Sequence, residues 1–181
     1  MRSTLKFILA LAVSLVAMMA FRAVVATVYT VEGDGLAPVF VKGDRVLVNR
    51  WSYGLRTGSD DGLFSYGRLC WQLVEVGDYV AYEDPRDSTR HTILFGRCHA
   101  QPGDTILCNG RPTVVPSRKD CADADYYWLR ALGQGNPTDS RELGFISEQR
   151  IIGRAVLIVY NHDARHPLSS GWRLERLLLP K

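Results

Sequence analysis

Few side chains of this 181-residue sequence could act as a base near neutral pH. Histidine can serve as a base at that pH, and the sequence has four: His91, His99, His162 and His166. Lysine is scarce, with only Lys6, Lys42, Lys119 and Lys181. A lysine base is therefore absent between positions 42 and 119. His162 and His166 fall in a polar loop and are assigned no role, so His91 and His99 are the histidines to weigh.

A glycine-rich segment at residues 31–50 is the second feature that suggests a site. Its first part is typical of an exposed loop and contains Gly33, Asp34, Gly35, Leu36 and Pro38. A turn signal at residues 42–44 and an apolar run at residues 45–49 follow. Because a hydrophobic N-terminal segment ends just before the loop, we expect the loop to lie close to a membrane surface.

The N-terminal segment, residues 5–28, is predicted to be a transmembrane helix. As a helix it would be about 36 Å long at about 1.5 Å per residue, enough to cross a bilayer. Arg2 and Lys6 favour a cytoplasmic terminus at residues 1–4, which puts residues 29–181 on the periplasmic side of the inner membrane. A secretory signal cleaved after Ala26 is an alternative with the same sidedness. A buried soluble helix is the third interpretation.

The rest of the sequence favours β structure, with glycine and proline turns between short apolar runs. The expected strands are residues 28–31, 45–49, 79–82, 92–97, 105–107, 113–115 and 151–160. Asn109-Gly110 is a hairpin turn signal between two of them. Residues 58–68 are expected to form a surface loop and residues 115–138 an irregular segment, apart from the apolar run at 126–129. Residues 172–179 are expected to form a short terminal helix.

Composition excludes some classes of function. A net charge of +3 from 22 basic and 19 acidic residues is too balanced for a nucleic-acid-binding protein.

Four cysteines outside the cytoplasm permit two disulfide bridges. Three pairings of Cys70, Cys98, Cys108 and Cys121 are possible, and Cys108–Cys121 is the favoured single bridge. No CxxC pair is present, so neither a zinc site nor any other metal or cofactor is expected.

The glycine-rich loop and the turn after it resemble the signature of signal peptidase I (peptidase family S26). This membrane-bound Ser/Lys protease removes signal peptides from exported proteins. The family has Gly-Ser-Met-x-Pro and then Gly-Asp-x-x-x-Val, where this sequence reads Asp34-Gly35-Leu36-Ala37-Pro38 and Gly43-Asp44-Arg45-Val46-Leu47-Val48. The resemblance places Gly35 at the nucleophilic serine, and glycine cannot form an acyl-enzyme. Gly33 takes the place of a second serine that contributes to the oxyanion hole in some members.

Two further family motifs are matched in part. The family lysine base precedes an arginine on a strand, ahead of a Pro-Gly-Asp turn; here that arginine is Arg97 and the lysine position is Gly96. A third motif ends in Asp-Ser-Arg, which is matched by Asp139-Ser140-Arg141. Pro137 stands where the family has the serine that orients the lysine.

The resemblance separates lost from kept residues by role. The lost positions are those of nucleophile, base and base-orienting hydroxyl: Gly35, Gly96 and Pro137. The kept residues are those assigned to turns and ion pairs: Asp44, Arg97, Asp104, Asp139 and Arg141. A register error of one or two residues would not supply a lysine, and both key matches are ungapped. We expect Gly35 and Gly96 to lie close together, with Cα atoms within about 10 Å, since two facing side chains span less than that.

A histidine could replace the lysine, as in the endoplasmic-reticulum branch of the family. His91 and His99, however, lie an odd number of residues from Gly96, so on a regular strand they face away from its side. Only a bulge could re-aim one of them. Asp34, beside the nucleophile position, is a poor nucleophile toward peptide bonds. We therefore expect no substitute catalytic site.

The sequence leads to one fold and two functions. The resemblance implies a mainly β fold, a coiled antiparallel core with a small inserted lobe at residues 105–138, preceded by the transmembrane helix. The favoured function is a pseudopeptidase, attached to the membrane lipid bilayer, that binds signal peptides or an active sister peptidase at the membrane surface without cleaving. Its expected peptide groove is formed by Gly33, Asp34, Gly35, Leu36 and Pro38. The alternative is an active signal peptidase I, a serine-type endopeptidase.

Overall fold

The protein is described from a computed structural model. The model describes residues 2–31, 35–58, 66–87, 92–108, 110–120, 123–132 and 138–161. The elements in chain order are α1 (Arg2–Val25), β1 (Ala26–Thr30), β2 (Asp44–Asn49), β3 (Leu55–Thr57), β4 (Gly67–Leu69), β5 (Tyr79–Glu83), β6 (Ile93–Ala100), β7 (Thr105–Cys108), β8 (Arg111–Val114), β9 (Tyr126–Arg130), α2 (Ser140–Leu143), β10 (Ile146–Ser147), a 3-10 helix (Glu148–Arg150) and β11 (Ile151–Asn161).

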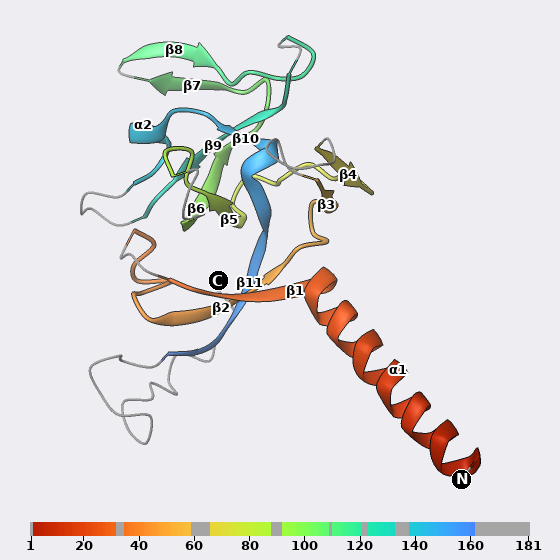
Figure 1. Cartoon of the computed structure of the whole chain (residues 1–181). Helices are drawn as coiled ribbons and strands as arrows, with labels where there is room; N and C mark the ends of the chain where they lie inside the picture. Colours follow the sequence, from red (N-terminus) through yellow and green to blue (C-terminus); the bar gives the residue numbers. More distant parts are fainter. Residues whose placement is uncertain are drawn as a thin grey trace.

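A curled antiparallel sheet dominates the fold (Figure 1). Within the described residues it has seven strands in the order β1-β2-β11-β5-β6-β9-β10. Its neighbouring strands run antiparallel. The long strand β11 pairs with β5 through its first residues and with β2 through the rest, and its register shifts at several points. Such bulges bend a strand and increase its twist, which is how one strand follows the curled sheet.

Strand β5 is buried on both faces and supplies side chains to two separate cores. Tyr79 and Ala81 belong to core 1, whereas Val80 and Tyr82 belong to core 2. The alternation follows from the period of two in a strand, which sends successive side chains to opposite faces. A strand buried on both faces reads in sequence as a continuous apolar run, as the YVAY run of β5 does.

A third, smaller core holds the β7–β8 hairpin against β9. It is built from Ala100, Ile106, Val115 and Trp128, with Phe145 packed at its edge. The hairpin forms a two-stranded sheet of its own, whereas β9 belongs to the large sheet. The expected lobe at residues 105–138 thus contains both this hairpin and a strand of the main sheet, and its division from the core stays a prediction.

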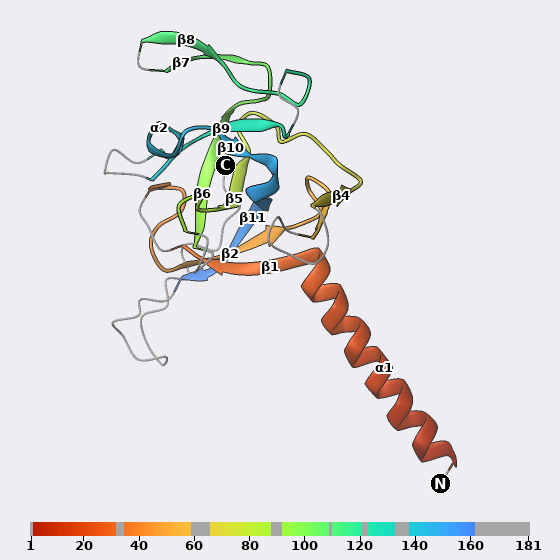
Figure 2. The same cartoon turned by 45° about the horizontal axis from the view of Figure 1, so that its top comes forward.

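Helix α1 projects away from the β domain in both views (Figures 1 and 2). It ends at Val25 rather than at residue 28, because residues 26–28 already pair with β2. Its large apolar side chains are exposed along the length whose side chains are described, from Phe7 to Met19. None of the helices, judged on the residues that the structure describes, combines the length and apolar character that a membrane crossing needs.

Each of the seven strands expected from the sequence has a counterpart, with ends that differ by up to three residues. The apolar run at 126–129, the exception within the expected irregular segment at 115–138, is the buried strand β9. The expected loop at 58–68 is wrong at its end, where Gly67 begins β4 and pairs with β3. The expected helix at 172–179 lies outside the described residues.

The disulfide expectation is not met by the cysteines that the structure describes. Cys70, Cys98 and Cys108 are free thiols, and Cys121 lies outside the described residues. Cys108, the expected partner of Cys121, is half-buried at the end of β7 and packs against the third core. Cys98 is buried in core 2.

Gly153 marks the point where β11 approaches the end of β2 most closely. A Cβ atom added there would lie 2.3 Å from the carbonyl oxygen of Asn49, a backbone atom that cannot rotate away. Gly153→Ala is therefore expected to lower the free energy of unfolding by about 1–3 kcal/mol, the usual cost of overpacking. Urea unfolding of the purified chain in detergent measures this change.

Gly67→Ala is the matched control for that variant. Its Cβ would meet only the side-chain oxygen of Thr57, at 3.1 Å, and that side chain can move. Equal stability losses at positions 67 and 153 would contradict the close backbone approach.

Candidate functional site

The glycine-rich loop is closed at its base by backbone hydrogen bonds. The N–H of Gly43 donates to the carbonyl of Val31 at 2.9 Å, and the N–H of Val31 donates to the carbonyl of Asp44 at 2.8 Å. The segment between them therefore leaves β1 and returns to β2 at neighbouring points. Gly35 lies in this segment, half-buried, at the start of a turn over residues 35–39.

The carboxylate of Asp44 holds the end of the loop in place through hydrogen bonds. It is fully buried and accepts a hydrogen bond from the N–H of Val41 at 2.8 Å and from the side-chain amide of Asn161 at 2.6 Å. Asn161 is the last residue of β11. Because a buried carboxylate is costly without hydrogen-bond donors, these contacts tie the loop to the end of β11.

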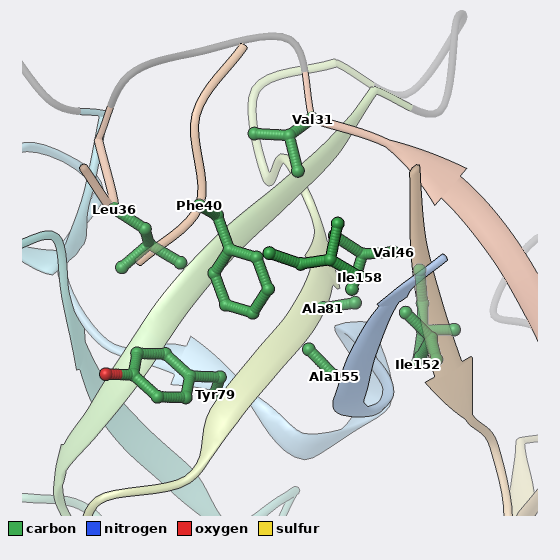
Figure 3. Close-up of a cluster of buried hydrophobic side chains, with 10 residues drawn as sticks. Val31, Leu36, Phe40, Val46, Tyr79, Ala81, Ile152, Ala155 and Ile158 are labelled. Carbon is green, nitrogen blue, oxygen red and sulfur yellow. The ribbon is translucent and has the colours of Figure 1, made fainter. Parts of the chain in front are cut away.

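Leu36 and Phe40 anchor the loop in core 1 (Figure 3). The ring of Phe40 meets Tyr79 edge-on at 5.4 Å between centroids and lies 6.1 Å from the ring of Phe95. Tyr79 comes from β5 and Phe95 from β6. The loop that contains Gly35 is thus packed on β6 one residue away from Gly96.

Gly96 is buried in β6 and faces the opposite core from Phe95. A Cβ atom at this position would lie 3.1 Å from the Cβ of Leu129 and 3.3 Å from the ring of Tyr82, both members of core 2. Leu129 belongs to β9, which is hydrogen-bonded to β6, so it has little freedom to withdraw. The first carbon of a side chain at the expected base position would therefore already crowd both neighbours.

The expected site residues are brought together only in part. The loop of Gly35 and the strand of Gly96 meet through Phe40 and Phe95, and the separation of the two glycines stays a prediction. Gly33, Asp34 and Pro137 lie outside the described residues. Leu129 and Tyr82, which crowd the base position, were not predicted from the sequence, although the apolar run at 126–129 was a signal for Leu129.

The expected scaffold residues each have a structural partner. Arg97 donates to the carbonyl of Gly77 at 3.2 Å, and its guanidinium lies 5.9 Å from the ring centroid of Tyr79. The carboxylate of Asp104 accepts from the N–H of Gln101 at 2.8 Å and closes the Pro-Gly-Asp turn.

Asp139 caps α2 and is almost fully buried, with 1% of its surface exposed. It accepts hydrogen bonds from the N–H groups of Ala131 and Arg141, at 2.9 and 2.8 Å, and pairs with the Arg141 guanidinium at 2.7 Å. Burial acts most strongly on its pKa and would raise it. The hydrogen bonds from the Arg141 side chain and from both N–H groups together outweigh burial, so the pKa of Asp139 is lowered.

Two other reactive groups lie near Gly96 in β6. His99 is exposed, and the register between β6 and β9 shifts between Cys98 and Ala100, so the bulge that could re-aim His99 is present. His91 lies outside the described residues. Cys98 shares the side of Gly96, but burial in the core, with the negative charges of Asp78 and Asp104, raises its pKa to about 12. A thiol with that pKa is inert as a nucleophile near neutral pH. Among the described residues, no cluster of side chains could hold a metal ion.

Comparison with protein families gives one match. A family model described as signal peptidase, peptidase S26, matches residues 4–119, which is more than half of the chain. The matched stretch contains α1, the glycine-rich loop, Gly96 and the Pro-Gly-Asp turn, and ends before Asp139. No curated protein matches the chain.

The lowered pKa of Asp139 predicts a pH-dependent contribution to stability. A carboxyl group with a lower pKa in the folded state stabilises the fold above its unfolded pKa of about 3.9, and this contribution is lost as pH falls through the folded value. At neutral pH, Asp139→Asn should lower the free energy of unfolding by about 1–3 kcal/mol, the range for hydrogen bonds to a charged group. The difference in free energy of unfolding between wild type and Asp139→Asn should become smaller as pH falls below about 3.9.

Urea unfolding at several pH values measures both quantities. Glu75→Gln removes an exposed carboxylate and should leave stability unchanged. The free energies of unfolding of wild type and Asp139→Asn could instead differ by a constant amount down to low pH. That result would show that the charge of Asp139 does not stabilise the fold.

Proposed function

The chain belongs to the signal peptidase family, peptidase S26, and from this premise we propose that it is a member that binds peptides without cleaving them. The proposed ligand is a signal peptide of an exported preprotein, with an active sister peptidase as a further partner. The proposal rests on one observation, which is the residue at position 96 and the packing around it. The base position has no side chain, and Leu129 and Tyr82 occupy the space beside it.

The nucleophile position supports the same proposal. A Ser/Lys protease needs a hydroxyl that attacks the carbonyl and a neutral amine that takes its proton. Gly35 supplies neither a hydroxyl nor any other reactive group. Catalytic groups that act as a unit lose nearly all their effect when one is removed, and here both of the central groups are glycine.

Retention of the scaffold is the argument for binding. Three features keep the loop in place: the closed base at Val31 and Gly43, the buried Asp44, and the anchors Leu36 and Phe40. None of these contacts takes part in bond cleavage. A chain that had lost every use for the loop would not need a buried carboxylate beneath it, which is costly unless fully hydrogen-bonded.

An active signal peptidase is the alternative function, and the family match is what favours it. It would require a base from elsewhere, and His99 is the described histidine nearest to Gly96 in sequence. His99 is exposed and lies where the register of β6 against β9 shifts, between Cys98 and Ala100. A histidine mechanism would need its imidazole to reach a peptide bound at the glycine-rich loop.

The proposal includes attachment to the inner membrane through α1, with the β domain on the periplasmic side. Its support is the row of exposed apolar side chains on the helix, among them Phe7, Leu9 and Val16, which are 70%, 64% and 65% exposed. Lys6 near the N-terminus favours a cytoplasmic start. The family match also begins within this helix, at residue 4.

Protease accessibility tests the proposed topology. Protease added to spheroplasts should digest the β domain while a cytoplasmic marker protein stays intact, because the β domain would lie outside the inner membrane. Alkaline carbonate extraction should leave the full chain in the pellet. A β domain that is digested only after the cells are lysed would rule out this orientation.

Restoring the missing groups tests the loss of catalysis. Gly35→Ser alone should not cleave a preprotein, because the hydroxyl has no base. Gly96→Lys alone should not cleave either, and it should destabilise the fold because Leu129 and Tyr82 crowd the new side chain. The double variant should show weak cleavage, and adding Pro137→Ser should raise it. The readout is the gel shift of a preprotein in detergent, followed by N-terminal sequencing of the product.

Two outcomes would count against the proposal. The first is cleavage by Gly35→Ser alone at a rate equal to that of the double variant, which would show that a base is already present. The second is cleavage by the unmutated chain that survives Gly35→Ala and is abolished by His99→Ala. That result would establish the histidine mechanism.

A further inference from the structure

Two arginines face each other directly across strands β6 and β9. Arg97 and Arg130 are paired residues in the antiparallel register. Paired residues share a face of the sheet, with Cβ atoms about 4.5–5.5 Å apart, and like charges in this position are destabilising. Arg97 is exposed and Arg130 is half-buried. The pair therefore needs an explanation other than fold stability.

Little in the surroundings neutralises these two charges. In the described part of the chain, neither Arg97 nor Arg130 forms an ion pair. The contacts of Arg97 are with a backbone carbonyl and the ring of Tyr79, and neither supplies a negative charge. Arg141, which lies near Arg130, is already paired with the buried Asp139.

The two arginines line a surface groove made of two adjoining depressions. One, of about 410 Å³, is lined by both arginines and by Val76 and Leu132 at its apolar end. The other, of about 580 Å³, extends past Arg130 toward the β7–β8 hairpin, where Leu107 lines it. His99 and Arg130 border both depressions. The groove thus continues from the edge of the main sheet to the hairpin.

The groove has a basic centre and apolar ends. The described carboxylate in its lining is Asp104, which accepts a hydrogen bond from the N–H of Gln101. The apolar side chains at the ends are unusually exposed, Val76 by 57% and Leu107 by 77%. A ligand that complements this pattern has carboxylates in the middle and apolar side chains on either side.

We propose that this groove binds an acidic, extended peptide segment of a partner protein, with a carboxylate of the peptide between Arg97 and Arg130. Guanidinium groups bind carboxylates with charge-assisted, often bidentate hydrogen bonds, and binding would relieve the repulsion between the pair. A small anion such as phosphate would satisfy the arginines but would leave the apolar ends uncovered. The site lies on the face of β6 opposite to the Gly96 side chain position, where Tyr79 contacts both Arg97 and Phe40 of the glycine-rich loop. The proposal rests on Arg97 and Arg130 and does not depend on loss of cleavage.

The experiment uses the full chain in an uncharged detergent and a short fluorescent peptide that alternates glutamate and leucine. Fluorescence anisotropy should detect binding that weakens as salt is raised, because exposed charges are screened. Arg97→Gln and Arg130→Gln should each weaken binding about fivefold or more, as expected for loss of one charged contact. Arg45→Gln removes an exposed arginine of β2 outside the groove and should leave binding unchanged.

A melting temperature separates loss of binding from loss of folding. Arg130→Gln removes a like-charge contact, so its melting temperature should equal or exceed that of wild type. A lower melting temperature would show that Arg130 supports the fold and would overturn the account of the pair.

The remaining outcomes also decide the question. Equal weakening by Arg45→Gln would mean that only net charge matters. A peptide with glutamine in place of glutamate that binds equally well would remove the role of the carboxylates. Binding of phosphate, or of anionic lipid vesicles, that depends on Arg97 and Arg130 while the acidic peptide does not bind would assign the groove to a different ligand. Each of these results would overturn the proposal.

Discussion

The pairing of β11 with two separate strands is the constraint on which the rest of the structure depends. Strands β1 and β2 hold the glycine-rich loop, whereas β5, β6, β9 and β10 hold Gly96 and its neighbours. In the described sheet, β11 joins these two groups, with β2 on one side and β5 on the other. The buried Asp78 strengthens this junction, because it accepts from Tyr53 at 2.8 Å and pairs with Arg154 of β11 at 3.0 Å.

The residues that match the signal peptidase motifs and those that depart from them differ in the contacts they make. Asp44, Asp104 and Asp139 each accept a hydrogen bond from a backbone N–H. A backbone donor that lost its acceptor would be left unsatisfied, which costs stability whether or not the protein cleaves anything. Gly35 and Gly96 have no such contacts to lose. The scaffold residues therefore hold the fold and its loop in place, whereas a serine at position 35 and a lysine at position 96 would serve cleavage alone.

Much of this fold could be predicted from the sequence. The apolar runs at 45–49, 79–82 and 151–160 could be predicted as strands from their length and composition, and a glycine turn precedes each of the first two. The YYWL run of β9 was recognised as apolar but its segment was not expected to join the main sheet, because a strand buried on both faces lacks the alternation that marks a half-exposed strand. Strands β3 and β4 are too short, at three residues each, to give a periodic signal.

The candidate site was harder to predict than the fold. The spacing of the family motifs located Gly96. No sequence pattern could reveal that Leu129 and Tyr82 lie where a side chain at position 96 would begin, since that depends on the register between β6 and β9. The pairing of Arg97 with Arg130 was missed for the same reason. Register across strands that are distant in sequence is set by tertiary packing, not by local propensity.

Intact-mass spectrometry of a preprotein mixed with the purified, unmutated chain tests the central claim most directly. The account predicts that the preprotein keeps its full mass throughout the incubation and that part of it elutes bound to the chain. An active signal peptidase in a parallel reaction should release the mature protein from the same substrate. Appearance of the mature mass with the unmutated chain, at a rate that follows its concentration, would contradict the account.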